Sequence, residues 1–159
     1  MTPKEAEAMV AELLGGSLVT DLSMQFGDID VMVPNEVGVP ADFCSVKLQK
    51  KAAITGNLSL EVSQTNTRNG MSILGNFLKC EADYIAFVVP YSDDENDVYL
   101  ISHEALLQYV KDHPMRKVRL SSKAQEENKR LGREYDSSES LLLPIVEAVK
   151  LAMKVYHGR

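Results

Sequence analysis

The sequence predicts an α/β fold, a three-layer sandwich in which helices flank a central mixed β-sheet. Hydrophobic residues recur with helical spacing in some segments and alternate in others, so helices and strands are expected to be interspersed. Residues 84–90 form a nearly continuous apolar run, which is typical of a central strand covered on both faces. The 159 residues, of which 45% are hydrophobic, suit one domain over residues 1–159.

The first expected element is an amphipathic helix over residues 3–14. Its apolar positions have the spacing of one helix face and are Ala6, Met9, Val10, Leu13 and Leu14. Pro3 lies in the first turn, where proline is tolerated, and two glycines follow the expected end. The pattern therefore predicts a helix that buries one face.

Strands are expected next, over roughly residues 18–24, 26–33, 41–49 and 57–63. The last of these segments alternates strictly between polar and apolar residues. A turn separates the second segment from the third, and its turn-forming residues are Pro34, Asn35, Gly38 and Pro40. These two segments are therefore expected to form a hairpin.

The second half of the chain continues the mixture of helices and strands. The expected elements are a helix over 73–78 that ends near Cys80, the buried strand 84–90, a strand over 98–101, a helix over 104–111, a short strand over 117–120, a polar loop with some helix over 121–140, and a helix from Pro144 to about Tyr156. The acidic residues 93–97 lack the glycine and the distal glutamate of a calcium loop, so they indicate a hairpin turn.

Charge and cysteine usage limit the classes of function. The net charge of −6 disfavours a protein that binds nucleic acid through its overall charge. The segment from Lys111 to Arg133 nevertheless contains eight basic and three acidic residues, which permits contacts with a phosphate backbone. Cys44 and Cys80 lack the companions of a zinc site. No targeting signal or long apolar run is apparent, so a cytoplasmic protein with no membrane partner is expected.

Acidic and basic side chains occur on three of the expected strands, each of which has an apolar opposite face. Alternation along the second expected strand places Asp28 and Asp30 on one face. On the next strand it places Lys47 opposite a row of apolar side chains, and the strand after that carries Glu61 on its polar face. If these strands are neighbours, the four side chains lie within reach of a shared ion.

Metal-assisted hydrolysis of a phosphodiester needs this combination of groups. Carboxylates hold Mg²⁺ or Mn²⁺, the ion polarises the phosphate and lowers the pKa of a bound water, and a nearby ammonium stabilises developing negative charge. The residues therefore predict an active centre formed by Asp30, Lys47 and Glu61. The expected metal ligands are Asp30, Glu61 and Asp28.

At these residues the sequence resembles the PD-(D/E)XK nuclease superfamily, which includes restriction enzymes and Holliday-junction resolvases. The family pattern is an Asp on one strand and Glu-x-Lys on the next. Asp30 matches the first element, and Ser45-Val46-Lys47 matches the second with serine in place of glutamate. A known variation has Ser-x-Lys at this position and recovers the acid from a later glutamate, to which Glu61 corresponds. The resemblance implies a restriction-endonuclease-like fold and a metal-dependent endonuclease that acts on DNA, with a homodimer as one arrangement.

The resemblance covers roughly residues 3–101 and admits a second alignment. In it, Pro40-Ala41-Asp42 supplies the Pro-Asp element and Glu61-Val62-Ser63 replaces Glu-x-Lys, which leaves the lysine unassigned. Because no intact Glu-x-Lys occurs in the chain, a second function stays open. It is a catalytically inactive nuclease-fold module that binds nucleic acid or a protein partner, with Lys47 and Glu61 as a structural ion pair.

Further residues are candidates of second rank. Ser45 occupies the place of the usual glutamate, and Gln49 is a candidate for contact with DNA or with a metal-bound water. Glu5 is a candidate for a further metal ligand, and Asp42 enters through the second alignment. Contacts with the nucleic-acid backbone are expected from Lys50, Lys51, Arg116 and Lys117.

Overall fold

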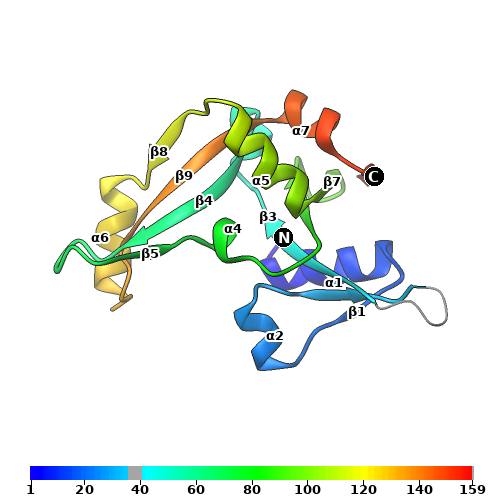
Figure 1. The fold of residues 1–159 in the computed structure, drawn as a ribbon, viewed down its shortest axis with the longest axis horizontal. Coiled ribbons are helices and arrows are strands. Elements are labelled where there is room, and N and C mark those ends of the chain that lie inside the picture. Colours follow the sequence, from blue (N-terminus) through cyan, green and yellow to red (C-terminus); the bar gives the residue numbers. More distant parts are fainter. Residues whose placement is uncertain (36–40, 159) are drawn as a thin grey trace.

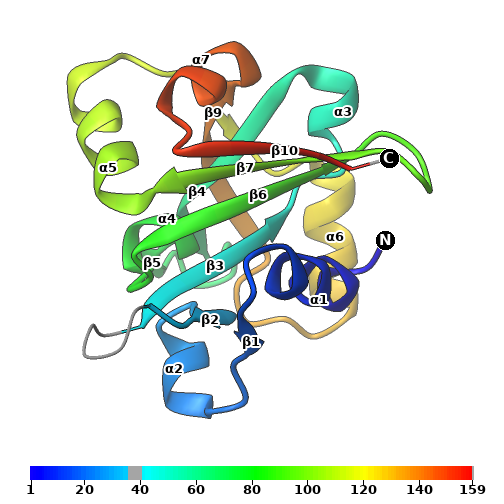
Figure 2. The same cartoon turned by 90° about the vertical axis from the view of Figure 1, so that its right-hand side faces the viewer.

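The computed structural model describes residues 1–35 and 41–158. In this part of the chain the strands form two sheets, one of six strands in the order β1-β2-β3-β6-β7-β10 and one of four in the order β5-β4-β9-β8 (Figures 1 and 2). The strands are β1 (Ser17–Leu18), β2 (Val31–Val33), β3 (Asp42–Leu48), β4 (Asn57–Thr65), β5 (Ser72–Leu74), β6 (Tyr84–Pro90), β7 (Asn96–Ser102), β8 (Lys117–Arg119), β9 (Ser137–Pro144) and β10 (Lys154–Gly158). The first sheet is mixed, because β3 and β6 run parallel and its other neighbours are antiparallel.

Helices lie between these strands along the chain, which confirms a mixed α/β fold. They are α1 (Pro3–Leu13), α2 (Leu22–Phe26), α3 (Ala52–Thr55), α4 (Asn76–Lys79), α5 (His103–Asp112), α6 (Ser122–Arg130) and α7 (Ile145–Leu151). Within the described ranges, every helix is too short or too polar to span a membrane.

Helix α1 forms where its sequence pattern predicts it. The Thr2 hydroxyl accepts the N–H of Glu5 at 3.2 Å, and the Glu5 carboxylate accepts the N–H of Thr2 at 2.6 Å. This reciprocal pair is a capping box, which satisfies two backbone donors that the first turn leaves free. Ala6, Val10 and Ala11 are buried, and the helix lies against β1, β2 and β3 (Figure 2).

The six-stranded sheet is covered on both faces, as the apolar run of β6 predicts. One face packs with α1 around Val31, Cys44 and Val88. The opposite face packs against the four-stranded sheet and α5, and this larger core includes Leu58, Leu60, Ile85, Phe87, Leu106 and Leu143. Alternate residues of one strand therefore serve two different cores.

The sequence predicts one central sheet, and the structure corrects this expectation. Strand β4 pairs with β5 and β9 in the second sheet and does not join β3. Strand β9 begins inside the polar segment that is expected to be a loop. Its serine-rich start has little intrinsic preference for a strand, so the pairing with β4 and β8 supplies its extended structure.

Two expected strands near the N-terminus are shorter than predicted. In the segment 18–24 only Leu18 belongs to a strand, and the last three residues begin helix α2, where the Asp21 side chain accepts the N–H of Ser23 at 2.8 Å. Within 26–33, only β2 is extended, because Asp28 has a φ of 61° directly after α2. The turn expected around Pro34 to Pro40 lies mostly outside the described residues.

Two helices also differ from their predicted lengths. Ile73 and Leu74 belong to β5, which pairs with β4, so the predicted helix is confined to α4. The final helix ends at Leu151, and β10 follows it at the edge of the first sheet beside β7. Val155 and Tyr156 pack into different cores, which is the alternation of a strand and not the pattern of a helix.

Gly75 lies where α4 meets β4, and the contact leaves no room for a side chain. A Cβ at this position would lie 2.5 Å from the carbonyl oxygen of Glu61 and 2.8 Å from the nitrogen of Ser63. Both atoms belong to the backbone of β4, where its register with β9 shifts. We expect Gly75→Ala to lower the free energy of unfolding by about 2 kcal/mol, measured by urea denaturation, because the strand must move. The exposed neighbour Leu74 provides the control, and equal stability of Gly75→Ala and Leu74→Ala would contradict the close contact.

Candidate active site

Strand β3 carries two of the predicted residues on one face, as alternation requires. Ser45 is fully buried, and Lys47 is half-buried with its side chain 24% exposed. The Lys47 ammonium donates to Asp28 Oδ1 at 2.7 Å and lies 2.6 Å from Asp28 Oδ2. The ion pair of Lys47 is therefore with Asp28, and the pair with Glu61 invoked by the alternative function is not formed between these described residues.

Asp28 reaches Lys47 from an unusual backbone conformation. Its φ of 61° is in the left-handed region, which aspartate tolerates better than most residues with a Cβ. The carboxylate is 17% exposed, and Oδ2 is buried with no hydrogen bond of good geometry. Attraction to the ammonium alone therefore compensates the burial of this oxygen.

Asp30 is held by the backbone of β3. Its Oδ2 accepts the N–H of Val46 at 2.7 Å and lies 3.5 Å from the Ser45 hydroxyl, which donates to it. Burial, with a smaller contribution from the negative charge of Asp28, raises the pKa of Asp30 above the usual range. Asp28 and Asp30 do not share a strand face as predicted, because both precede β2, yet their side chains still meet at β3.

Glu7 is a member of this cluster that sequence reasoning missed. It lies on α1, and burial raises the pKa of its carboxyl, with the charge of Asp30 as the next cause. Its position three residues before Val10 puts it beside the buried face of the helix, which is the signal that could have found it. Glu5, the acid selected from the sequence, instead points to Thr2 in the capping box.

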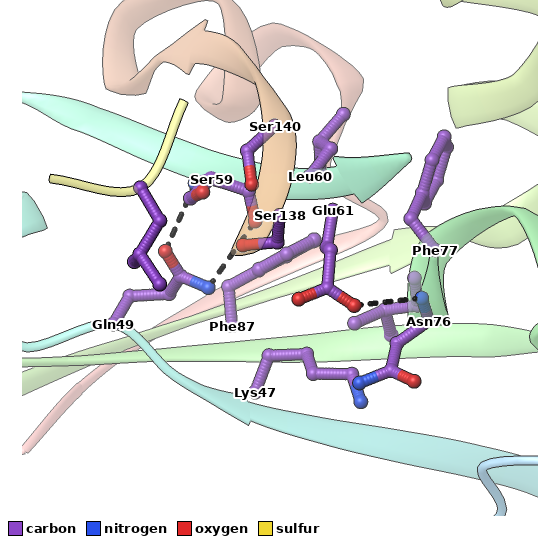
Figure 3. A pocket seen from close by; sticks show the side chains of 12 residues that line it. Lys47, Gln49, Ser59, Leu60, Glu61, Asn76, Phe77, Phe87, Ser138 and Ser140 are labelled. Atoms are coloured by element: carbon purple, nitrogen blue, oxygen red, sulfur yellow. Dashed lines mark hydrogen bonds between the residues drawn. The ribbon is translucent and has the colours of Figure 1, made fainter. Parts of the chain in front are cut away.

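Glu61 lies on β4 and therefore approaches from the other sheet. Its Oε1 accepts the side-chain amide of Gln64 at 2.7 Å and the backbone N–H of Asn76 at 3.2 Å. Among the described residues, no hydrogen bond joins Glu61 to Asp30 or Lys47. Glu61 and Lys47 nevertheless line one cavity of about 300 Å³ between the sheets (Figure 3).

The second-rank residues have different environments. Gln49 accepts the N–H of Ser59 at 2.9 Å and donates to its carbonyl at 3.4 Å, so it joins the end of β3 to β4. Asp42 is at the opposite end of β3 from Lys47, beside Val33. Its partner in the second alignment, Pro40, lies outside the described residues.

The basic residues expected to contact DNA are exposed and lie on two segments. Lys50 and Lys51 lie in the turn between β3 and α3. Arg116 and Lys117 lie at the start of β8, where Lys117 is 3.7 Å from Glu139. Lys51 also lines a neighbouring cavity that shares Gln49 with the first one. Lys51 therefore borders the space between the sheets, whereas Arg116 lines a separate cavity with Pro114 and Leu142.

Asp28 and Asp30 supply the chemistry that Mg²⁺ selects. Mg²⁺ prefers oxygen ligands, is commonly bound through one or two carboxylates and keeps several waters. The neighbouring carboxylates of Asp28 and Asp30 have this oxygen chemistry, and Asp28 Oδ2 is fully buried 2.6 Å from the Lys47 ammonium. The residues that the structure describes contain no group of three or more His, Cys, Asp or Glu side chains arranged around a common metal position.

Comparison with known proteins identifies no relative of this chain among protein families or curated proteins.

Proposed function

We propose that this protein is a metal-dependent endonuclease that hydrolyses phosphodiester bonds in DNA and has a restriction-endonuclease-like fold. The observation that carries the proposal is the meeting of two carboxylates and an ammonium at β3. Asp28 binds the ammonium of Lys47, and Asp30 binds the backbone one residue earlier. Acidic groups around a lysine at the end of a central strand are what metal-assisted phosphoryl chemistry needs.

The order of strands supports the same proposal. Helix α1 is followed by the antiparallel strands β1, β2 and β3, and β6 then adds parallel to β3. Over roughly residues 3–101, the resemblance to the PD-(D/E)XK superfamily implies a helix, a strand hairpin, a further strand and a helix. The first helix and the hairpin correspond to α1, β2 and β3, whereas the further strand, β4, belongs to the other sheet.

The residues of this chain have separate roles in the proposed reaction. Asp30 and Asp28 would hold Mg²⁺ or Mn²⁺, which supplies polarisation of the phosphate and a more acidic water when bound. Lys47 places its ammonium beside these carboxylates, where it orients the attacking water and stabilises negative charge on the phosphate. Glu61 Oε2 accepts no hydrogen bond from the described residues, so it is free to bind the metal or a water from the opposite wall.

Cleavage of labelled DNA tests this proposal directly. The purified chain is incubated with linear, supercoiled and branched DNA in Mg²⁺, in Mn²⁺ and in EDTA. We expect cleavage that needs the metal and that falls at least about 100-fold in Glu61→Gln, because a group at the reacting centre is lost. Glu12→Gln, which changes an exposed glutamate on α1, is the matched control. Absence of cleavage with every substrate and both metals would contradict the nuclease function.

One observation favours the second candidate, an inactive nuclease-fold module that binds nucleic acid or a protein. The Lys47 ammonium is already neutralised by Asp28 at both oxygens, and Ser45 stands where the family has an acid. Mn²⁺ titration followed by thermal unfolding separates the two functions. An active nuclease gains stability from the ion through Asp30, whereas the module does not.

A further inference from the structure

The cavity beside Lys47 is lined by many residues that have no role in the proposed hydrolysis (Figure 3). One part of its wall is apolar and consists of Leu60, Phe77, Ile85 and Phe87. The other part is polar and, besides Lys47 and Glu61, includes Gln49, Ser59, Asn76, Ser138 and Ser140. Apolar walls with a few convergent polar groups are typical of sites for a small organic ring.

Several polar groups on this wall have no hydrogen-bond partner in the part of the chain that the structure describes. Among the described residues, no hydrogen bond is made by the hydroxyls of Ser138 and Ser140 or by the side-chain amide of Asn76. The two serines are alternate residues of β9, so their side chains leave the same face of the sheet. Figure 3 shows them on the same side of β9 as the cavity. These groups are available to donate to and accept from a bound ligand.

Without a bound metal ion, a phosphate group is not favoured inside this cavity. The Glu61 carboxylate in the wall then repels an anion, and Asp28 balances the positive charge of Lys47. A neutral heteroaromatic ring fits better, because it can contact the apolar part of the wall while its edge pairs with hydroxyl and amide groups. A volume of about 300 Å³ is at the lower end of the range for small-molecule sites and suits one such ring.

We propose that the cavity receives a single nucleobase that has left the base stack. The inference rests on the proposed function, and it specifies the substrate as DNA with an unpaired nucleotide beside the cleaved bond. The sugar-phosphate backbone of that nucleotide would then lie beside Lys47 and the carboxylates of Asp28 and Asp30. Unpairing costs least at a mismatch, a lesion or a single-stranded end, so these structures are the preferred substrates.

Binding in EDTA tests the inference separately from cleavage. The probes are two otherwise identical duplexes with one 2-aminopurine, which is opposite an abasic site in one duplex and opposite thymine in the other. We expect the first duplex to bind at least tenfold more tightly and its 2-aminopurine fluorescence to change on binding. Ser140→Phe fills the cavity and is expected to remove this preference. Ser17→Phe adds the same ring to an exposed strand residue of the other sheet and is the control.

A second variant guards against misfolding of Ser140→Phe. The double variant Ser138→Ala and Ser140→Ala removes only two hydroxyls, and we expect the preference to fall at least threefold in it. Equal binding of the two duplexes, or full preference in both cavity variants, would overturn the inference. Cleavage by wild-type protein without any preference would overturn the base site alone, and preference without cleavage in Mg²⁺ or Mn²⁺ would overturn the nuclease alone.

Discussion

Asp30→Asn is expected to abolish metal-dependent cleavage and to stabilise the folded protein at neutral pH. Burial raises the pKa of Asp30, so the folded state binds its proton more tightly than the unfolded state does. Ionisation at neutral pH therefore reduces the free energy of unfolding. Asparagine has no charge to bury, and its side-chain oxygen can still accept the N–H of Val46. We expect the Tm to rise by a few degrees while cleavage falls at least about 100-fold.

The pH dependence of this effect follows from the direction of the shift. For wild-type protein, the contribution of Asp30 to stability decreases as pH rises from the ordinary aspartate pKa, about 3.9, through the higher pKa of the folded state. The stability gain of the variant should therefore be complete above the folded-state pKa and absent below the ordinary value. Urea denaturation between pH 3 and pH 8 measures this difference. An Asp30→Asn protein that is less stable than wild type at neutral pH would show that the carboxylate is structural.

Lys47→Met is expected to lose cleavage and also to destabilise the fold. The side chain of Asp28 is 17% exposed, and its Oδ2 has only the lysine charge to compensate its burial. Removing that charge leaves a carboxylate that is both poorly solvated and unpaired, which costs about 3 kcal/mol in comparable ion pairs. The free energy of unfolding from urea denaturation at neutral pH measures the effect. Cleavage should fall at least about 100-fold because the ammonium beside the reacting group is missing.

A double variant separates the two effects of this lysine. Asp28→Asn combined with Lys47→Met removes both charges, so it should recover most of the stability lost in Lys47→Met. It should not recover cleavage, since neither the ammonium nor the second carboxylate is present. If the double variant were as unstable as Lys47→Met, the burial of Asp28 would not be the cause of the loss.

The predictable part of the fold is the part with strong local patterns. Helix α1 has a capping box and an apolar stripe, and β6 is a continuous apolar run, so each can be recognised in isolation. Strands β3 and β7 and helix α5 also agree with the pattern of their residues. The second sheet could not be predicted in this way. The polar first half of β9 is extended only because β4 and β8 pair with it.

The candidate site likewise has a part that follows from local sequence patterns and a part that depends on tertiary packing. Alternation along β3 correctly places Ser45 and Lys47 on one face of the strand, because that face is set by the backbone. Asp28 and Asp30 come together for a different reason from the one predicted: Asp28 lies in a left-handed turn and Asp30 is held by Val46. Glu7 comes from a helix distant in sequence. Its place beside the buried face of α1 is a local signal, but only the docking of α1 on the sheet brings it near Asp30.

Lys47 and Glu61 stand on different sheets, and this arrangement makes the dimensions of the cavity a property of the hydrophobic core. Phe87, which lines the cavity, is almost fully buried in the apolar layer between the sheets. Packing at this position therefore acts as a spacer that limits the width of the cavity. A change of side-chain volume at the spacer would alter the size of the group that the cavity accepts without altering any polar residue of the site. The specificity of this architecture would then change through its hydrophobic core.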